Sequence, residues 1–207
     1  MEINYYTEFA EACAKGMPEK DCRKYFKRYD HKELPRIIKA LGFLKSVTPT
    51  TLLDVGPGRG RSLWPIAYAL PQTNITCIDK SKWRCEVIGA VHKGGVHRIT
   101  IFNVDASNIP FKSNSFDVVS ALEVIEHIPN AQNALIEVAR VARNFIIISV
   151  PSKPDNNPDH VHFFTKEKFE DLLDKIEKDS GKIFRRITFD YVPNHMLVVI
   201  RLSESRK

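Results

Sequence analysis

Residues 53–60 read LDVGPGRG, in which three glycines alternate with other residues directly after an apolar run. The preceding TTLLDV is short, apolar and rich in β-forming residues, and the following RSLWPIAYAL has a helical pattern despite its proline. Glycines at a strand-to-helix turn let the backbone adopt positive φ and approach a ligand closely. This turn therefore predicts an α/β fold with a binding site where the first strand ends.

The rest of the chain from residue 50 onward agrees with this prediction, because apolar β-rich runs alternate with helical patterns. Continuous apolar runs such as FIIISV are typical of parallel strands that helices cover on both faces. We predict a doubly wound, Rossmann-like sheet of seven mostly parallel strands, closed by a C-terminal hairpin that places one antiparallel strand. Strands are expected at 50–55, 74–79, 97–105, 115–125, 144–151 and twice within 182–202, with helices at 61–70, 81–95, 130–142 and 165–179.

Residues 1–47 have a different, helical character, with Pro35 suited to the first turn of a third helix. This segment carries too little apolar surface to fold alone, so we expect an N-terminal helical cap or lid on a main domain of residues 48–207. Its aromatic side chains either cover an acceptor pocket or form the packing face of the cap. They are Tyr5, Tyr6, Phe9, Tyr25, Phe26 and Tyr29.

Composition points to a cytoplasmic globular protein. The 207 residues are 43% hydrophobic, and no apolar run approaches the roughly 20 residues of a membrane helix. The first residues lack a basic-then-apolar pattern, so no signal peptide and no membrane partner are expected. The net charge of +6 is spread along the chain, which favours a solvated basic surface over a nucleic-acid site. The cysteines show neither CxxC nor metal spacing and are expected to be reduced thiols: Cys13, Cys22, Cys77 and Cys85.

Acidic residues follow the next two strands. Asp79 ends the second strand, where a carboxylate can accept hydrogen bonds from both ribose hydroxyls or simply partner the following helix. Asp105 ends the third strand in NVDASNIPF, where it can accept a proton of an adenine amino group. The glycine spacing is G-x-G-x-G, with Arg61 where a dinucleotide site would need its third glycine, so a nicotinamide cofactor is disfavoured. The turn instead favours a carboxylate or phosphate next to a nucleoside.

Together, LLDVGPGRG, CIDKS, NVDASNIPFKSNSFDVV and ALEVIEHI resemble the class I S-adenosylmethionine-dependent methyltransferases over residues 50–150. The resemblance implies S-adenosylmethionine as cofactor and S-adenosylhomocysteine as product. It implies that the glycine turn holds the methionine part, Asp79 the ribose, and Asp105 with Ala106 the adenine. Two departures are Pro57, where many members have a small residue or cysteine, and ARNFIIISVP, which lacks a Lys-Pro-Gly-Gly turn. The implied cofactor residues are Asp54, Gly56, Pro57, Gly58, Gly60, Asp79, Lys80, Asp105, Ala106, Leu122 and Glu123.

A second group of residues follows the fourth and fifth strands. In ALEVIEHIPN, the spacing of Glu123, Glu126 and His127 is i, i+3 and i+4, so one helical turn would place all three on a common face. The long loop VPSKPDNNPDHVHFFTKEKF after the fifth strand contains His160. Both segments leave the carboxyl edge of neighbouring strands, so we expect them to converge beside the methyl donor.

Three interpretations of this second group remain open. In the first, Glu126 and His127 form a local hydrogen-bonded turn and the histidines pin the loop. In the second, Glu126, His127 or His160 acts catalytically by removing the acceptor proton. In the third, Glu123 joins these three residues to bind a divalent metal, as in the small-RNA 3′-terminal 2′-O-methyltransferases that the motif also resembles. No metal is assigned in the favoured interpretation.

The favoured function is transfer of a methyl group from S-adenosylmethionine to an O, N or C atom of a small molecule. One alternative is a metal-dependent RNA ribose 2′-O-methyltransferase, although no added RNA-binding domain is evident. Another is a module that binds the cofactor without catalysis. The acidic and histidine-bearing loops argue against such a module.

Overall fold

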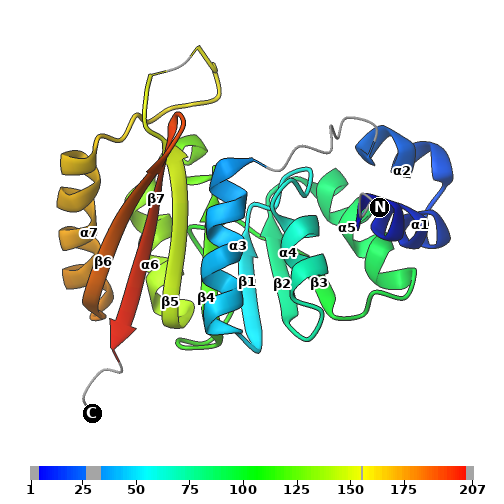
Figure 1. Cartoon of the computed structure of the whole chain (residues 1–207), viewed down its shortest axis with the longest axis horizontal. Coiled ribbons are helices and arrows are strands. Elements are labelled where there is room, and N and C mark those ends of the chain that lie inside the picture. The colour runs from blue at the N-terminus through cyan, green and yellow to red at the C-terminus, as the bar shows by residue number, and fades with distance from the viewer. Residues whose placement is uncertain (1–4, 27–33, 155, 204–207) are drawn as a thin grey trace. The chain divides into compact units, whose positions relative to one another are not determined.

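The computed structural model describes residues 5–26, 34–154 and 156–203. Seven strands form one sheet in the order β3-β2-β1-β4-β5-β7-β6 (Figure 1). The paired strands are parallel except that β7 is antiparallel to both β5 and β6. The prediction of a mostly parallel sheet with one antiparallel strand is therefore confirmed. The strands are β1 Thr51–Val55, β2 Asn74–Asp79, β3 Ile99–Asn103, β4 Phe116–Leu122, β5 Ala142–Pro151, β6 Ile183–Val192 and β7 His195–Ser203.

The helices lie where the sequence periodicity predicts them. Ser81 and Thr165 accept hydrogen bonds from the backbone N–H groups of Arg84 and Lys168, so both side chains act as N-caps. The described helices are α1 Tyr5–Gly16, α2 Glu19–Phe26, α3 Pro35–Val47, α4 Leu63–Ala69, α5 Lys82–Lys93, α6 Ala131–Val141 and α7 Lys166–Ser180, with a 3-10 helix at Ile125–His127.

The chain divides into two compact units, Met1–Asn103 and Val104–Lys207. This division differs from the expected boundary between a cap of residues 1–47 and a domain of residues 48–207, which stays a prediction. No helix in the described ranges is long and apolar enough to cross a bilayer.

In the first unit, the parallel register brings the carboxyl ends of β1 and β2 together. Val55 lies opposite Ile78 in the ladder. The N–H of Gly56 then donates to the Ile78 carbonyl at 2.8 Å, so the glycine turn begins directly beside the end of β2. This is the arrangement that the sequence predicts for a ligand turn.

The N-terminal helix α1 packs closely on α5. A Cβ added to Gly16 would lie 2.1 Å from the carbonyl oxygen of Ala90, and one added to Gly94 would lie 1.8 Å from that of Ala12. Two helix backbones can approach this closely only where the contacting residue has no side chain. The helix α1 is therefore fixed to α5 by the shape of both surfaces.

A disulfide joins Cys13 of α1 to Cys22 of α2. The prediction that all four cysteines are reduced thiols is wrong for this pair, because packing of α1 against α2 brings together two cysteines that the sequence spacing does not connect. Cys77 and Cys85 are free thiols. Burial, followed by the charge of Asp54, raises the pKa of the Cys77 thiol well above its usual value, so this buried thiol is unreactive.

In the second unit, β4 and β5 are parallel and the β6–β7 hairpin closes the sheet (Figure 1). The hairpin turns at Asn194, which adopts φ +65°, a conformation that asparagine tolerates better than most residues. The loop that follows β5 extends beyond the carboxyl end of that strand, on the same side as the hairpin turn.

The close contact between α1 and α5 predicts the effect of one added methyl group. We expect Gly94→Ala to lower the free energy of unfolding by about 1–3 kcal/mol, because its Cβ meets the backbone of Ala12. The matched control is Gly42→Ala in α3, where a Cβ would meet nothing within 4 Å. This control should raise stability by about 0.5–1 kcal/mol. Urea denaturation measures both, and equal stability of the two variants would contradict the packing argument.

Candidate functional site

The turn after β1 has three glycines in the left-handed region, because φ is 64° at Gly56, 58° at Gly58 and 82° at Gly60. At Gly60 a Cβ would lie 2.0 Å from the indole Nε1 of Trp64. That indole N–H is buried and has no hydrogen-bond partner among the described residues. The turn therefore places the buried indole donor of Trp64 directly beside three glycines in the left-handed conformation.

Asp79 holds this turn against the start of α5. Its Oδ2 accepts a hydrogen bond from the N–H of Gly58 at 3.2 Å, and its Oδ1 accepts one from the N–H of Ser81 at 2.8 Å. Arg84 lies 3.4 Å from Oδ2, and the carboxylate is 2% exposed. Asp79 thus makes the helix-start contact that the sequence leaves open, while its role toward a ribose stays a prediction. Lys80 is exposed next to it.

Tyr25 reaches the same turn from α2. Its hydroxyl donates to the carbonyl oxygen of Gly58 at 2.9 Å, and its side chain is fully buried. Its ring packs near Trp64 and Trp83. The sequence predicts Tyr25 only as a residue of the cap. Its contact with Gly58, 33 positions away, leaves no local pattern in the sequence.

The other aromatic residues of the cap either pack in the interior or lie outside the described residues. Phe9 stacks on Trp64 with ring centroids 4.9 Å apart, and Phe26 lies 5.6 Å from the same ring. These contacts favour the packing interpretation for both residues. Tyr6 is half-buried, whereas Tyr29 and the side chain of Tyr5 lie outside the described residues.

In the second unit, Asp105 begins a tight turn. Its Oδ1 accepts from the N–H of Ser107 at 2.8 Å, and its side chain is exposed. Ala106 is half-buried beside it. Ile109, later in the same segment, is held by Glu137. The backbone N–H of Ile109 donates to Oε2 of Glu137 at 2.8 Å. Hydrogen bonds from Arg140 lower the pKa of the Glu137 carboxyl, so this support is ionised at neutral pH.

Glu123, directly after Leu122, does not take the expected helical position. It adopts φ +59°, and only the residues Ile125–His127 form a short 3-10 helix. Its Oε1 accepts from the hydroxyl of Ser149 at 2.7 Å, and its Oε2 lies 3.0 Å from Nε2 of His195. The expectation of one helical face for Glu123, Glu126 and His127 is therefore wrong, because partners on β5 and β7 hold Glu123 instead.

Glu126, His127 and His160 do converge. One potential ligand atom from each lies within 4.8 Å of the others, and the two imidazole centroids are 4.6 Å apart. Glu126 is fully buried and both histidines are half-buried. The predicted meeting of the turn after β4 with the loop after β5 is thus confirmed for these three residues.

The loop is fixed to the 3-10 helix by hydrogen bonds. The N–H groups of Val161 and His162 both donate to the Glu126 carbonyl, at 2.9 and 3.2 Å. The ring Nε2 of His162 lies 3.0 Å from the carbonyl oxygens of Ile128 and Pro129. Histidine pinning of the loop, as the first interpretation expects, is therefore present.

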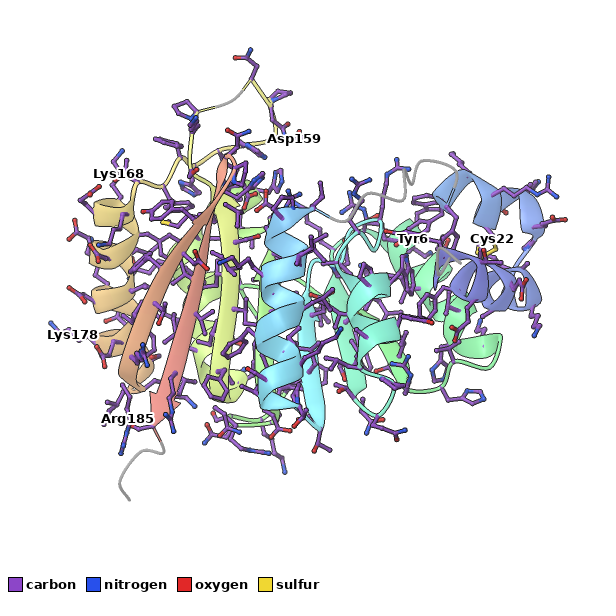
Figure 2. The ribbon with its side chains drawn as sticks, in the orientation of Figure 1. Tyr6, Cys22, Asp159, Lys168, Lys178 and Arg185 are labelled. Atoms are coloured by element: carbon purple, nitrogen blue, oxygen red, sulfur yellow. A yellow bond between two sulfur atoms is a disulfide. The ribbon has the colours of Figure 1, made fainter. Side chains whose placement is uncertain are left out.

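The orientation of His127 also has a defined origin. Its Nδ1 lies 2.9 Å from the carbonyl oxygen of Asp159, a residue of the loop after β5 that Figure 2 labels. A carbonyl oxygen only accepts, so Nδ1 carries the proton and Nε2 of the neutral ring has the lone pair. This tautomer can accept a proton or ligate a metal through Nε2.

Four residues of these sites are not predicted from the sequence: Tyr25, Trp64, Ser149 and His195. His195 lies within the predicted C-terminal hairpin, whereas Trp64 and Ser149 occupy apolar segments whose pattern indicates burial alone. Tyr25 lies in the charged helix α2, and its partner Gly58 is 33 positions away, so no local signal marks it.

Comparison with known proteins adds an independent finding. Residues 53–145 match the family described as "Methyltransferase domain". The O-methyltransferase rstn1 of Aspergillus nomiae is 32% identical over 102 residues, which are 48% of this chain and 45% of that protein. Norajmaline N-methyltransferase of Rauvolfia serpentina is 32% identical over 100 residues, 47% of this chain and 34% of that protein. The chain thus spans less than half the length of these relatives.

Among solved structures, the chain is similar to 1,6-didemethyltoxoflavin-N1-methyltransferase of Burkholderia thailandensis, which was crystallised with its acceptor and S-adenosylhomocysteine. The TM-score is 0.61 at 17% identity, covering 82% of this chain and 79% of that one. At this identity the similarity concerns the fold.

Loop pinning by His162 leads to a prediction about local opening. We expect His162→Phe to increase the rate of proteolytic cleavage within residues 152–165 about fivefold, because the hydrogen bonds to Ile128 and Pro129 are lost. The same replacement at the exposed His97 serves as control and should leave the cleavage rate unchanged. Equal cleavage of both variants would show that His162 does not hold the loop.

Proposed function

We propose that this chain is a class I S-adenosylmethionine-dependent methyltransferase and that it methylates an O, N or C atom of a small molecule. S-adenosylmethionine is the cofactor of this family. Norajmaline N-methyltransferase is named for a small acceptor, which supports a small acceptor for this chain as well. The observation that carries the proposal is the positive-φ glycine turn tied to Asp79 at the end of β2.

The residues of the first unit fit the cofactor. The turn from Asp54 to Gly60 would hold the methionine carboxylate and amino group, with the indole N–H of Trp64 as a further donor. Asp79 would accept the ribose hydroxyls through its remaining lone-pair capacity, since a carboxylate offers about four sites. In the second unit, the exposed Asp105 would accept the adenine amino group.

The cofactor, when bound, supplies a methyl group on a sulfonium, which is already an activated electrophile. The protein's main contribution is then to align the acceptor, which can lower the barrier by roughly 7–11 kcal/mol. Proton removal from a hydroxyl or amine acceptor falls to His127, because its bond to the Asp159 carbonyl places the proton on Nδ1 and leaves the lone pair on Nε2. Glu126 and His160, beside this ring, would support the resulting imidazolium.

Binding of the cofactor product tests the proposal directly. We expect wild-type protein to bind S-adenosylhomocysteine in calorimetry and not to bind NAD. Asp105→Ala should weaken binding about tenfold, because it removes a charged hydrogen-bond acceptor. Asp174→Ala on α7 is the control and should leave the affinity unchanged. Methyl transfer from labelled cofactor to a fractionated cell extract then identifies the acceptor class. If the small-molecule fraction stays unlabelled while RNA or protein is labelled, the acceptor proposal fails.

A second candidate function rests on the cluster of Glu126, His127 and His160, whose ligand atoms lie within 4.8 Å of one another. We propose as the alternative that this cluster holds a divalent metal such as Mn²⁺, which would lower the pKa of a ribose hydroxyl of an RNA end. Glu123, the fourth residue of the motif, is engaged by Ser149 and His195 instead. Three protein ligands still suit a catalytic metal, which keeps positions open for substrate.

The two candidates predict opposite effects of metal removal. If His127 acts as a base without metal, EDTA leaves methyl transfer unchanged and Mn²⁺ does not bind to the protein. If the cluster binds metal, EDTA abolishes transfer, and His160→Ala weakens Mn²⁺ binding at least tenfold in calorimetry. His92→Ala, in the first unit, is the control for nonspecific loss of an imidazole.

A further inference from the structure

Both polar groups of the Gly58 peptide unit are held by side chains. The N–H donates to Asp79, and the carbonyl oxygen accepts the hydroxyl of Tyr25 at 2.9 Å. Asp79 belongs to β2 and sits at the start of α5, whereas Tyr25 belongs to the cap helix α2. The central residue of the cofactor turn therefore has one partner in the sheet and another in the cap.

The helix α2 depends on outside support to keep Tyr25 in place. It has eight residues, and helices of this length are unstable alone in water. Cys22 and Tyr25 are three residues apart and thus share one helix face, and both are buried. The disulfide from Cys22 to Cys13 of α1 is visible as the yellow bond at Cys22 in Figure 2. This covalent link is placed one helical turn from the hydroxyl that bonds to Gly58.

The other end of the link is rigid. Cys13 lies on α1, which packs on α5 through the glycine contacts at Gly16 and Gly94. Since α5 begins just after Asp79, the elements form a closed frame: α5, α1, the disulfide, α2, Tyr25 and the Gly58 turn. A frame of this kind reduces the conformational freedom of the turn before any ligand is present.

We propose that Tyr25 is a positioning residue for the cofactor turn, and that the Cys13–Cys22 disulfide makes cofactor affinity depend on its redox state. The inference rests on the proposed function, since it assumes that the turn binds the cofactor. A dithiol reductant supplies two electrons and, with two protons, converts the disulfide to two thiols, while the dithiol itself becomes a disulfide. Reduction releases α2 from α1 and frees Tyr25 from Gly58.

The Tyr25 hydroxyl is tested by Tyr25→Phe, which keeps the ring that packs against Trp64 and Trp83. We expect S-adenosylhomocysteine to bind about fivefold more weakly in calorimetry, in line with loss of one neutral hydrogen bond. Tyr191→Phe, at an exposed position on β6, is the matched control and should bind like wild type. Because loss of this buried hydrogen bond also lowers the free energy of unfolding, binding is measured well below the melting temperature of both proteins, where a merely structural role would leave the affinity unchanged.

The disulfide is tested in the same assay with and without dithiothreitol, and by the variant Cys13→Ala/Cys22→Ala. Reduction of wild type and the double cysteine replacement should each weaken S-adenosylhomocysteine binding by fivefold or more, relative to oxidised wild type. In Tyr25→Phe, reduction should add little further loss, because the two changes act through one contact. Glu19→Gln, which removes an exposed ion pair with Arg23 on α2, controls for general weakening of that helix.

The outcomes separate this inference from the proposed function. If oxidised wild type fails to bind S-adenosylhomocysteine, both are overturned. If wild type binds and Tyr25→Phe binds equally well, only the role of Tyr25 is overturned. If reduction weakens wild type and Tyr25→Phe to the same extent, the disulfide does not act through Tyr25, and the proposed coupling fails.

Discussion

The carboxylate of Asp79 is the interaction on which the first unit's site depends. It joins the N–H of Gly58 to the N–H of Ser81, so the glycine turn and the first turn of α5 are set by one buried group. A buried carboxylate is stable only when hydrogen bonds replace its lost water, and these two amides with Arg84 supply that replacement. The same bonds that satisfy the charge therefore shape the turn. The turn is therefore held in one conformation by the protein itself, which limits the entropy that it would lose on binding a ligand.

The sequence predicts the elements well because their signals are local. The run NITCID matches β2 at both ends, since a short apolar β-rich run marks a strand within a few residues. The glycine turn and Asp79 were found for the same reason. The disulfide was missed because pairing of Cys13 with Cys22 follows from the packing of two helices, and the nine-residue separation itself carries no information. Tyr25 was assigned to the cap and not to the turn for the same physical reason.

Glu123 shows how tertiary contacts override a spacing argument. The i, i+3, i+4 pattern assumes a regular helix, but Glu123 has φ +59° and bonds to Ser149 and His195 from two other strands. No local pattern predicts that Glu123 contacts His195, 72 positions later. The contact arises because the β6–β7 hairpin places His195 opposite Pro151, at the end of β5. The consequence is a division between the two acids of the motif: the Glu123 carboxylate contacts Ser149 and His195 of the sheet, and Glu126 lies beside the two histidines of the cluster. Two carboxylates in different environments are suited to different roles.

Rigidity of the loop after β5 matters because methyl transfer depends on alignment more than on a strong base. A long loop rich in proline and asparagine would ordinarily place a catalytic side chain poorly. Here two N–H groups and the His162 ring attach the loop to the turn after β4, and the Asp159 carbonyl in turn orients His127. Each segment thus fixes a side chain of the other: the loop orients His127, and the turn after β4 holds His162. This reciprocal support gives loop residues the positional precision that regular elements usually provide.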